Sequence, residues 1–148
     1  MRRLVLIPIA LIAGLGGCSR RDAAPAVTHA WVRLPAVSGQ AAAAYFTVHG
    51  GSGVETLVKV ESTLAQRAEM HESMAGMRGM TTMAPLAVVE VPASGIVAFA
   101  PGARHVMLFG LDKAITPGTA VPLRFGFKGG KTAEAEAKTV AAGEEAPY

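Results

Sequence analysis

The chain has 148 residues, of which 51% are hydrophobic and 17% charged, with a formal net charge of +3 and one cysteine. This length suits a single domain with its own core, and a lone cysteine excludes an intrachain disulfide. The basic residues form no stripe with interleaved aromatic residues, so we expect no nucleic-acid partner.

The first 17 residues are typical of an export signal. Met1-Arg2-Arg3 precede an apolar run that is interrupted by Pro8 and ends at Cys18. This run is shorter than the roughly 20 residues that a membrane-spanning helix needs, so we expect it to be removed. Without Arg2 and Arg3, 12 basic residues remain against 11 acidic ones, and the net charge falls to about +1.

The end of this segment predicts lipidation. Leu15-Gly16-Gly17-Cys18 resembles a bacterial lipobox, in which cleavage precedes a cysteine that then carries lipid. A conventional signal cut near residues 23–26 is the alternative. We expect an exported, monomeric protein in the periplasm of a Gram-negative bacterium, attached to a membrane through a lipid anchor only.

The rest of the chain is typical of an all-β fold, because short apolar or alternating runs are separated by turns rich in glycine and proline. The predicted domain covers 27–140, after a linker at 18–26 and before a flexible tail at 141–148. Residues 41–44 and 62–68 are candidates for single helical turns. The predicted strands are 28–34, 43–48, 55–60, 67–72, 86–91, 96–100, 105–110 and 122–128, with a last edge strand at 132–140.

Methionine is concentrated in one stretch, since five of the seven methionines lie at positions 70, 74, 77, 80 and 83. Their spacing would form one stripe on a helix, but Gly76 and Gly79 disfavour a helix. A glycine-bearing hairpin is therefore predicted. Met70 alternates with His71 and is expected to face the core, whereas methionines exposed on a loop have little core to fill.

A second histidine and methionine lie downstream. In an extended strand, residues two apart share a face, so His105 and Met107 project together while Val106 and Leu108 face the core. Their expected partners are His71 and one hairpin methionine.

Two imidazoles and two thioethers form a donor set that suits Cu(I), because thioether sulfur is a soft, neutral ligand. Zinc prefers thiolate, imidazole or carboxylate, and calcium and magnesium need oxygen ligands. A blue-copper electron carrier is excluded because no cysteine thiolate is available within the domain.

The spacing of these residues resembles the signature of the periplasmic copper chaperones of the PCuAC family. His71 is followed by Glu72 in a slot that is optionally methionine, then by ten residues and Met83, then by twenty-one residues and His105-Val106-Met107. The stretches at 29–33 and 42–47 resemble the first two strands of that family.

The resemblance implies a cupredoxin-like antiparallel β-sandwich or barrel that binds one Cu(I) through His71, Met83, His105 and Met107. It further implies delivery of copper to the dinuclear copper centre of a respiratory cytochrome c oxidase, or to another terminal oxidase. The expected partner is thus a copper-accepting oxidase subunit or another copper chaperone. Met74, Met77 and Met80 are candidate auxiliary ligands.

Other functions stay open at this point. A copper storage or resistance protein would hold more than one equivalent, and a non-metal β-sandwich lipoprotein would bind a protein partner instead. An enzyme is disfavoured because no nucleophile elbow, P-loop or H-E-x-x-H motif is present. His29 and His49 are expected at the surface or at strand ends, and Trp31 and Tyr45 as core or capping aromatics.

Overall fold

The structure is a computed structural model that describes residues 23–76 and 80–148, and these residues form ten strands and no helix. The export segment, Cys18 and Met77 lie outside the described residues. Within the described ranges, no helix is long and apolar enough to cross a membrane. The strands are β1 Ala26–Arg33, β2 Ala42–His49, β3 Glu55–Glu61, β4 Arg67–Ala75, β5 Thr81–Pro85, β6 Val89–Val91, β7 Ile96–Phe99, β8 Arg104–Phe109, β9 Ala120–Phe127 and β10 Thr132–Val140.

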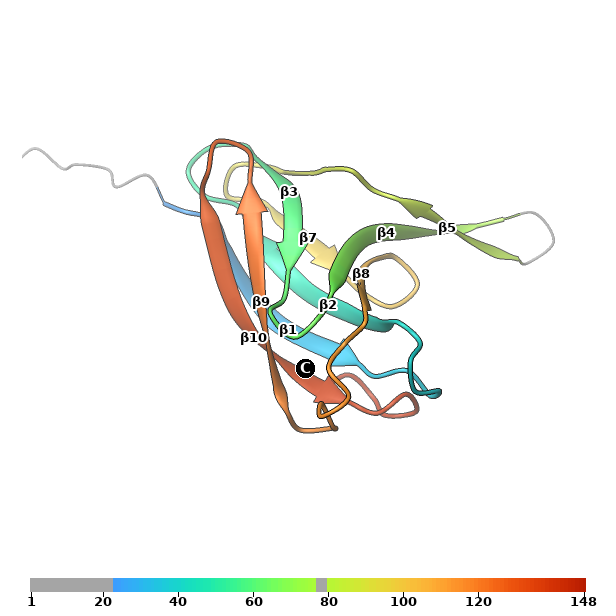
Figure 1. The fold of residues 1–148 in the computed structure, drawn as a ribbon. Helices are drawn as coiled ribbons and strands as arrows, with labels where there is room; N and C mark the ends of the chain where they lie inside the picture. Colours follow the sequence, from blue (N-terminus) through green and yellow to red (C-terminus); the bar gives the residue numbers. More distant parts are fainter. Residues whose placement is uncertain (1–22, 77–79) are drawn as a thin grey trace, which may run out of the picture.

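The strands form one curled sheet in the order β5-β4-β8-β2-β1-β10-β9-β3-β6 (Figure 1). The second half of β2 pairs with β7 and its first half with β8. The pairs are antiparallel, as predicted, except for β1 with β10, which pair in parallel and make the sheet mixed. The prediction of β10 as an edge strand is wrong, because it lies between β1 and β9.

The core lies inside the curl of the sheet and follows strand alternation. In β9, Val121, Leu123, Phe125 and Phe127 are buried at every second position. Phe46 on β2 stacks on Phe99 and meets the edge of Phe125, with ring centroids 4.3 Å and 4.7 Å away. Each such buried side chain contributes about 1.5–3 kcal/mol through removal of apolar surface from water, which lets the fold stand without a disulfide.

A smaller apolar cluster covers the outer face of the same sheet. It consists of Trp31, Tyr45 and Val140, all buried, with the Trp31 and Tyr45 rings 4.4 Å apart. The Arg33 guanidinium lies 4.9 Å from the centre of the Trp31 ring. Burial raises the pKa of Tyr45 above its usual 10.0, while the charge of Arg33 opposes this shift. Trp31 and Tyr45 are thus packed aromatics, but outside the main core.

Three local predictions need correction. Residues 42–44 continue β2 instead of forming a helical turn, because Ala42 and Ala44 are small side chains buried against the core. Residues 62–66 form a tight turn and β4 begins at Arg67. The sequence also missed β5, whose residues are mostly exposed and so lack the apolar pattern of a core strand.

The hairpin formed by β4 and β5 projects from the body of the barrel (Figure 1). Met70 on β4 is buried in the core, as alternation predicts, whereas Met74, Met80 and Met83 further out are exposed. The hairpin is therefore anchored at its base and leaves most of its methionines accessible.

Candidate metal centre

Strands β4 and β8 place two histidines opposite one another. His71 pairs with His105 in the antiparallel register, and their rings lie 6.0 Å apart between centroids with an angle of 23° between planes. Directly opposed residues project on the same face of a sheet, so both imidazoles stand on the outer face. Met107 shares this face because it lies two residues after His105 on β8 and opposite Glu69.

Met83 reaches the same face from β5. It pairs with Ser73, which lies two residues after His71 on β4 and so projects on the same side. Its side chain is 59% exposed, whereas His105 is only 5% exposed. Three neighbouring strands thus bring the four predicted ligands to one face, from a buried end at His105 to an open end at Met83.

His105 is oriented by its own strand. Its Nδ1 lies 3.0 Å from the carbonyl oxygen of Ala103, and because a carbonyl only accepts, Nδ1 must donate a hydrogen. The other ring nitrogen, Nε2, therefore keeps its lone pair in the neutral ring. A fixed tautomer with one free nitrogen is the usual state of a histidine ligand.

His71 has the opposite arrangement. Its Nε2 lies 3.2 Å from the Oε2 carboxylate oxygen of Glu69, while its Nδ1 is buried and has no hydrogen-bond partner among the described residues. Buried polar atoms are nearly always paired, so an unpartnered nitrogen calls for an explanation. A soft metal ion beside Nδ1 supplies one, and the four side chains accordingly fit a copper ion.

The neighbouring side chains complete the setting. The Tyr45 ring lies 6.5 Å from that of His105 and links the candidate centre to the outer apolar cluster of Trp31, Tyr45 and Val140. Arg104 pairs with Glu72 at 3.3 Å, and both alternate with the two histidines and so project on the other face. The four candidate ligands are themselves neutral side chains.

The candidate auxiliary methionines do not join this set in the same way. Met74 pairs with Thr82 and alternates with His71, which places it on the opposite face of the hairpin. Met80 precedes β5 and is 66% exposed, and Met77 lies outside the described residues. Register therefore separates Met74 from the four.

The remaining histidines lie elsewhere. The hydroxyl oxygen of Thr28 lies 2.8 Å from His49 Nε2 and 3.1 Å from His29 Nδ1, and His49 is the last residue of β2. This agrees with the predicted surface and strand-end positions. Within the described ranges no three histidine, cysteine, aspartate or glutamate side chains cluster as a metal site.

Sequence reasoning missed Glu69 and the carbonyl of Ala103, which hold the two imidazoles. Glu69 could have been found from alternation, because it lies two residues before His71 on the same strand face. A backbone carbonyl carries no signal in the sequence.

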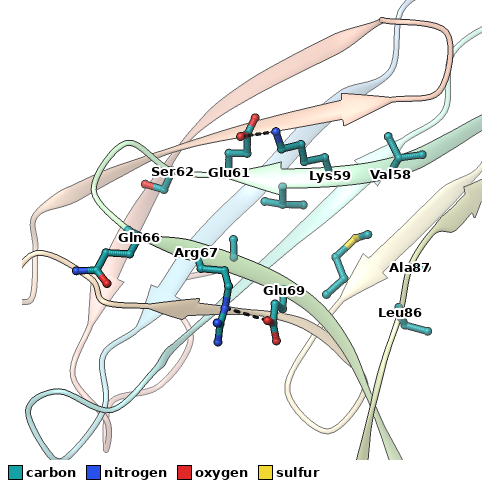
Figure 2. A pocket seen from close by; sticks show the side chains of 13 residues that line it. Val58, Lys59, Glu61, Ser62, Gln66, Arg67, Glu69, Leu86 and Ala87 are labelled. Atoms are coloured by element: carbon teal, nitrogen blue, oxygen red, sulfur yellow. Dashed lines mark ion pairs between the residues drawn. The ribbon is translucent and has the colours of Figure 1, made fainter.

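Glu69, which contacts His71, also lines a groove between β3 and β4 (Figure 2). Ion pairs flank it, with Lys59 and Glu61 at 2.6 Å and Arg67 and Glu69 at 2.9 Å. Glu69 therefore contacts Arg67 through one carboxylate oxygen and His71 through the other.

Several known proteins are similar to this chain in sequence or in structure. A relative from Leifsonia xyli subsp. xyli, named "Putative lipoprotein Lxx21020", is 29% identical over 83% of this chain and 80% of its own length. The copper-bound PCuAC domain from PmoF2 is 23% identical over 78% of this chain and 91% of that domain, with a TM-score of 0.63. The apo PCuAC domain from PmoF1 is 25% identical over 78% and 92%, with a TM-score of 0.62.

A solution structure of CuI-DR1885 from Deinococcus radiodurans also matches, with 24% identity over 84% of this chain and 82% of that one and a TM-score of 0.54. These structures confirm the cupredoxin-like fold and the resemblance to PCuAC domains. Residues 25–139 match the family described as "Putative lipoprotein LpqE-like", which covers all but the last residue of the ten strands. The chain therefore belongs to the LpqE-like family and has the fold of a PCuAC domain.

Proposed function

We propose that the protein is an exported copper carrier that binds one Cu(I) through His71, Met83, His105 and Met107. The observation that carries the proposal is the register of β5, β4 and β8, which brings these four side chains to one face. The related domain from PmoF2 is copper-bound, and DR1885 is described with CuI, which supports the same cargo here.

The chemistry of the donors favours the lower oxidation state. Two thioethers and two neutral imidazoles add no negative charge, and soft sulfur ligands prefer Cu(I) over Cu(II). Methionine also resists formation of disulfides, which would disable a cysteine pair in an oxidising compartment.

The gradient of exposure suits delivery of the ion. A partner approaching from the open side meets Met83 first, and its own ligands can replace thioethers one at a time while His105 still holds the copper. The recipient that we propose is the dinuclear copper centre of a respiratory cytochrome c oxidase. A storage protein would have less need of a site that is exposed to a partner on one side.

We also propose that Cys18 carries the lipid anchor, with the strands at 26–140 forming the copper-binding domain. The family description and the name of the Leifsonia relative both include the word lipoprotein, which supports export and anchoring. An anchor of this kind keeps the carrier close to membrane-bound oxidases.

Anaerobic titration with Cu(I), in competition with a chromophoric chelator, tests the site. One tight equivalent is expected, and His105→Ala or Met107→Ala should weaken it by about 100-fold or more, since even outer-shell partners of metal ligands are worth 10–100-fold. The control is His49→Ala, which removes a histidine that contacts Thr28. Full affinity in both ligand variants would refute the assignment.

A second measurement separates delivery from storage. The copper-loaded protein is mixed anaerobically with an apo oxidase domain that carries the dinuclear site, the two proteins are separated, and the copper bound to each is measured by elemental analysis. A carrier loses its copper to the acceptor, whereas a storage protein retains it and takes up more than one equivalent in the titration.

A further inference from the structure

We propose that Glu69 is a positioning residue that makes the two histidines present different nitrogens to the copper, Nδ1 from His71 and Nε2 from His105. This inference rests on the proposed function for the identity of the ion. The arrangement of protons on the two rings stands on the geometry of the chain alone.

The first step concerns which nitrogen of His71 carries the hydrogen. Glu69 Oε2 lies 3.2 Å from Nε2, and an ionised carboxylate can only accept a hydrogen bond. In the neutral ring the hydrogen therefore lies on Nε2, and the lone pair lies on Nδ1. That Nδ1 is the buried nitrogen without a partner among the described residues.

The second step concerns His105, where the same logic gives the other tautomer. Its Nδ1 donates to the carbonyl of Ala103 at 3.0 Å, which leaves Nε2 as the free donor atom. His71 and His105, which face each other across β4 and β8, are thus held in opposite tautomers. The side chain of Glu69 holds that of His71, and the backbone carbonyl of Ala103 holds that of His105.

The third step concerns how Glu69 itself is held. Its Oε1 lies 2.9 Å from Arg67 Nε, so the carboxylate contacts Arg67 with one oxygen and His71 with the other. Arg67, Glu69 and His71 lie at alternate positions of β4 and share one face. The guanidinium of Arg67 and the imidazole of His71 therefore meet different oxygens of the same carboxylate, which lies between them on this face.

The arrangement has a functional consequence. An outer carboxylate that accepts from a ligating histidine fixes the ring and makes its free nitrogen a better donor, an effect typically worth 10–100-fold in metal affinity. His71 has no backbone carbonyl in this role within the described residues, so Glu69 is the residue on which its orientation depends.

The test reads the tautomers directly in the apo protein. Residues 23–148 contain all ten strands and the cores described above, so this segment, labelled with ¹⁵N, serves for long-range ¹H–¹⁵N correlation spectra at pH 8. We expect the hydrogen of His71 on Nε2 and that of His105 on Nδ1. Glu69→Ala should turn His71 into a mixture of tautomers, leave His105 unchanged and weaken Cu(I) binding by about 10-fold or more.

The matched control is Glu72→Ala, which removes a carboxylate next to His71 that projects on the other face and pairs with Arg104. It should leave both tautomers and the Cu(I) affinity as they are. The proposal is overturned if His71 carries its hydrogen on Nδ1 in the unaltered apo protein, or if Glu69→Ala leaves its spectrum unchanged. If the unaltered protein binds no Cu(I), the proposed function fails, while the tautomers can still be measured in the apo protein. If the apo spectra show other tautomers, this inference alone fails.

Discussion

The body of the barrel and the projecting β4–β5 hairpin use the same alternation of side chains with different results. In the body, every second residue enters a closed core, as Phe46 and Phe125 do. In the outer part of the hairpin neither face is covered, so Met74 on one side and Met83 on the other are both exposed. Where a hairpin extends beyond the core, alternation no longer determines which residues are apolar and which are polar. Its positions can then carry side chains that bind a metal ion.

The largest effect that this contrast predicts is on stability. Phe46→Ala removes a ring that is 1% exposed and packed against Phe99 and Phe125, so it should lower the free energy of unfolding by about 3–5 kcal/mol. Urea unfolding followed by Trp31 fluorescence measures the change.

The hairpin supplies the control for this substitution. Met80→Ala removes a side chain that is 66% exposed and should change the free energy of unfolding by no more than about 0.5 kcal/mol. Equal losses in the two variants would mean that the hairpin is part of the core and that the contrast between the two regions is mistaken.

An intermediate effect is expected on copper binding when the two faces of the hairpin are compared. Met83→Ala should weaken Cu(I) binding by about 10-fold, less than loss of His105, because a soft but exposed ligand is partly replaced by water or by another thioether. Met74→Ala has the same chemistry on the opposite face and should have no effect. Competition titrations of the two variants side by side measure the difference, and a larger loss for Met74→Ala would reverse the assignment.

The sequence predicted most of the fold because core strands have strong signals. The alternation of Val121, Leu123 and Phe125 identifies β9, and the resemblance to the PCuAC signature implies that His71 and His105 meet, as they do in the structure. The parallel pairing of β10 with β1 could not be read, since alternation within a strand does not name its neighbour.

The candidate site likewise combines features that the sequence reveals with features that it does not. Its candidate ligands have distinctive chemistry and spacing. The groups that orient them, Glu69 and the carbonyl of Ala103, have no sequence signal that distinguishes them from other glutamates and other backbone carbonyls. The hairpin strand β5 was missed for a related reason, because exposed residues such as Thr81 and Thr82 have no apolar pattern to reveal it.

The smallest expected effect concerns Tyr45, which joins the body to the candidate centre. Burial raises the pKa of Tyr45 in the folded protein, with Arg33 opposing the shift, so folding favours the protonated phenol. This contribution to stability is complete below the unfolded value of about 10 and is lost as the pH rises through the folded pKa. Between pH 9 and pH 11 the unaltered protein should therefore lose more of its free energy of unfolding than Tyr45→Phe, as measured by urea unfolding at each pH.

Because the phenol does not belong to the donor set, Tyr45→Phe should keep its Cu(I) affinity at pH 7, and a marked loss there would extend the candidate centre from the hairpin into the body.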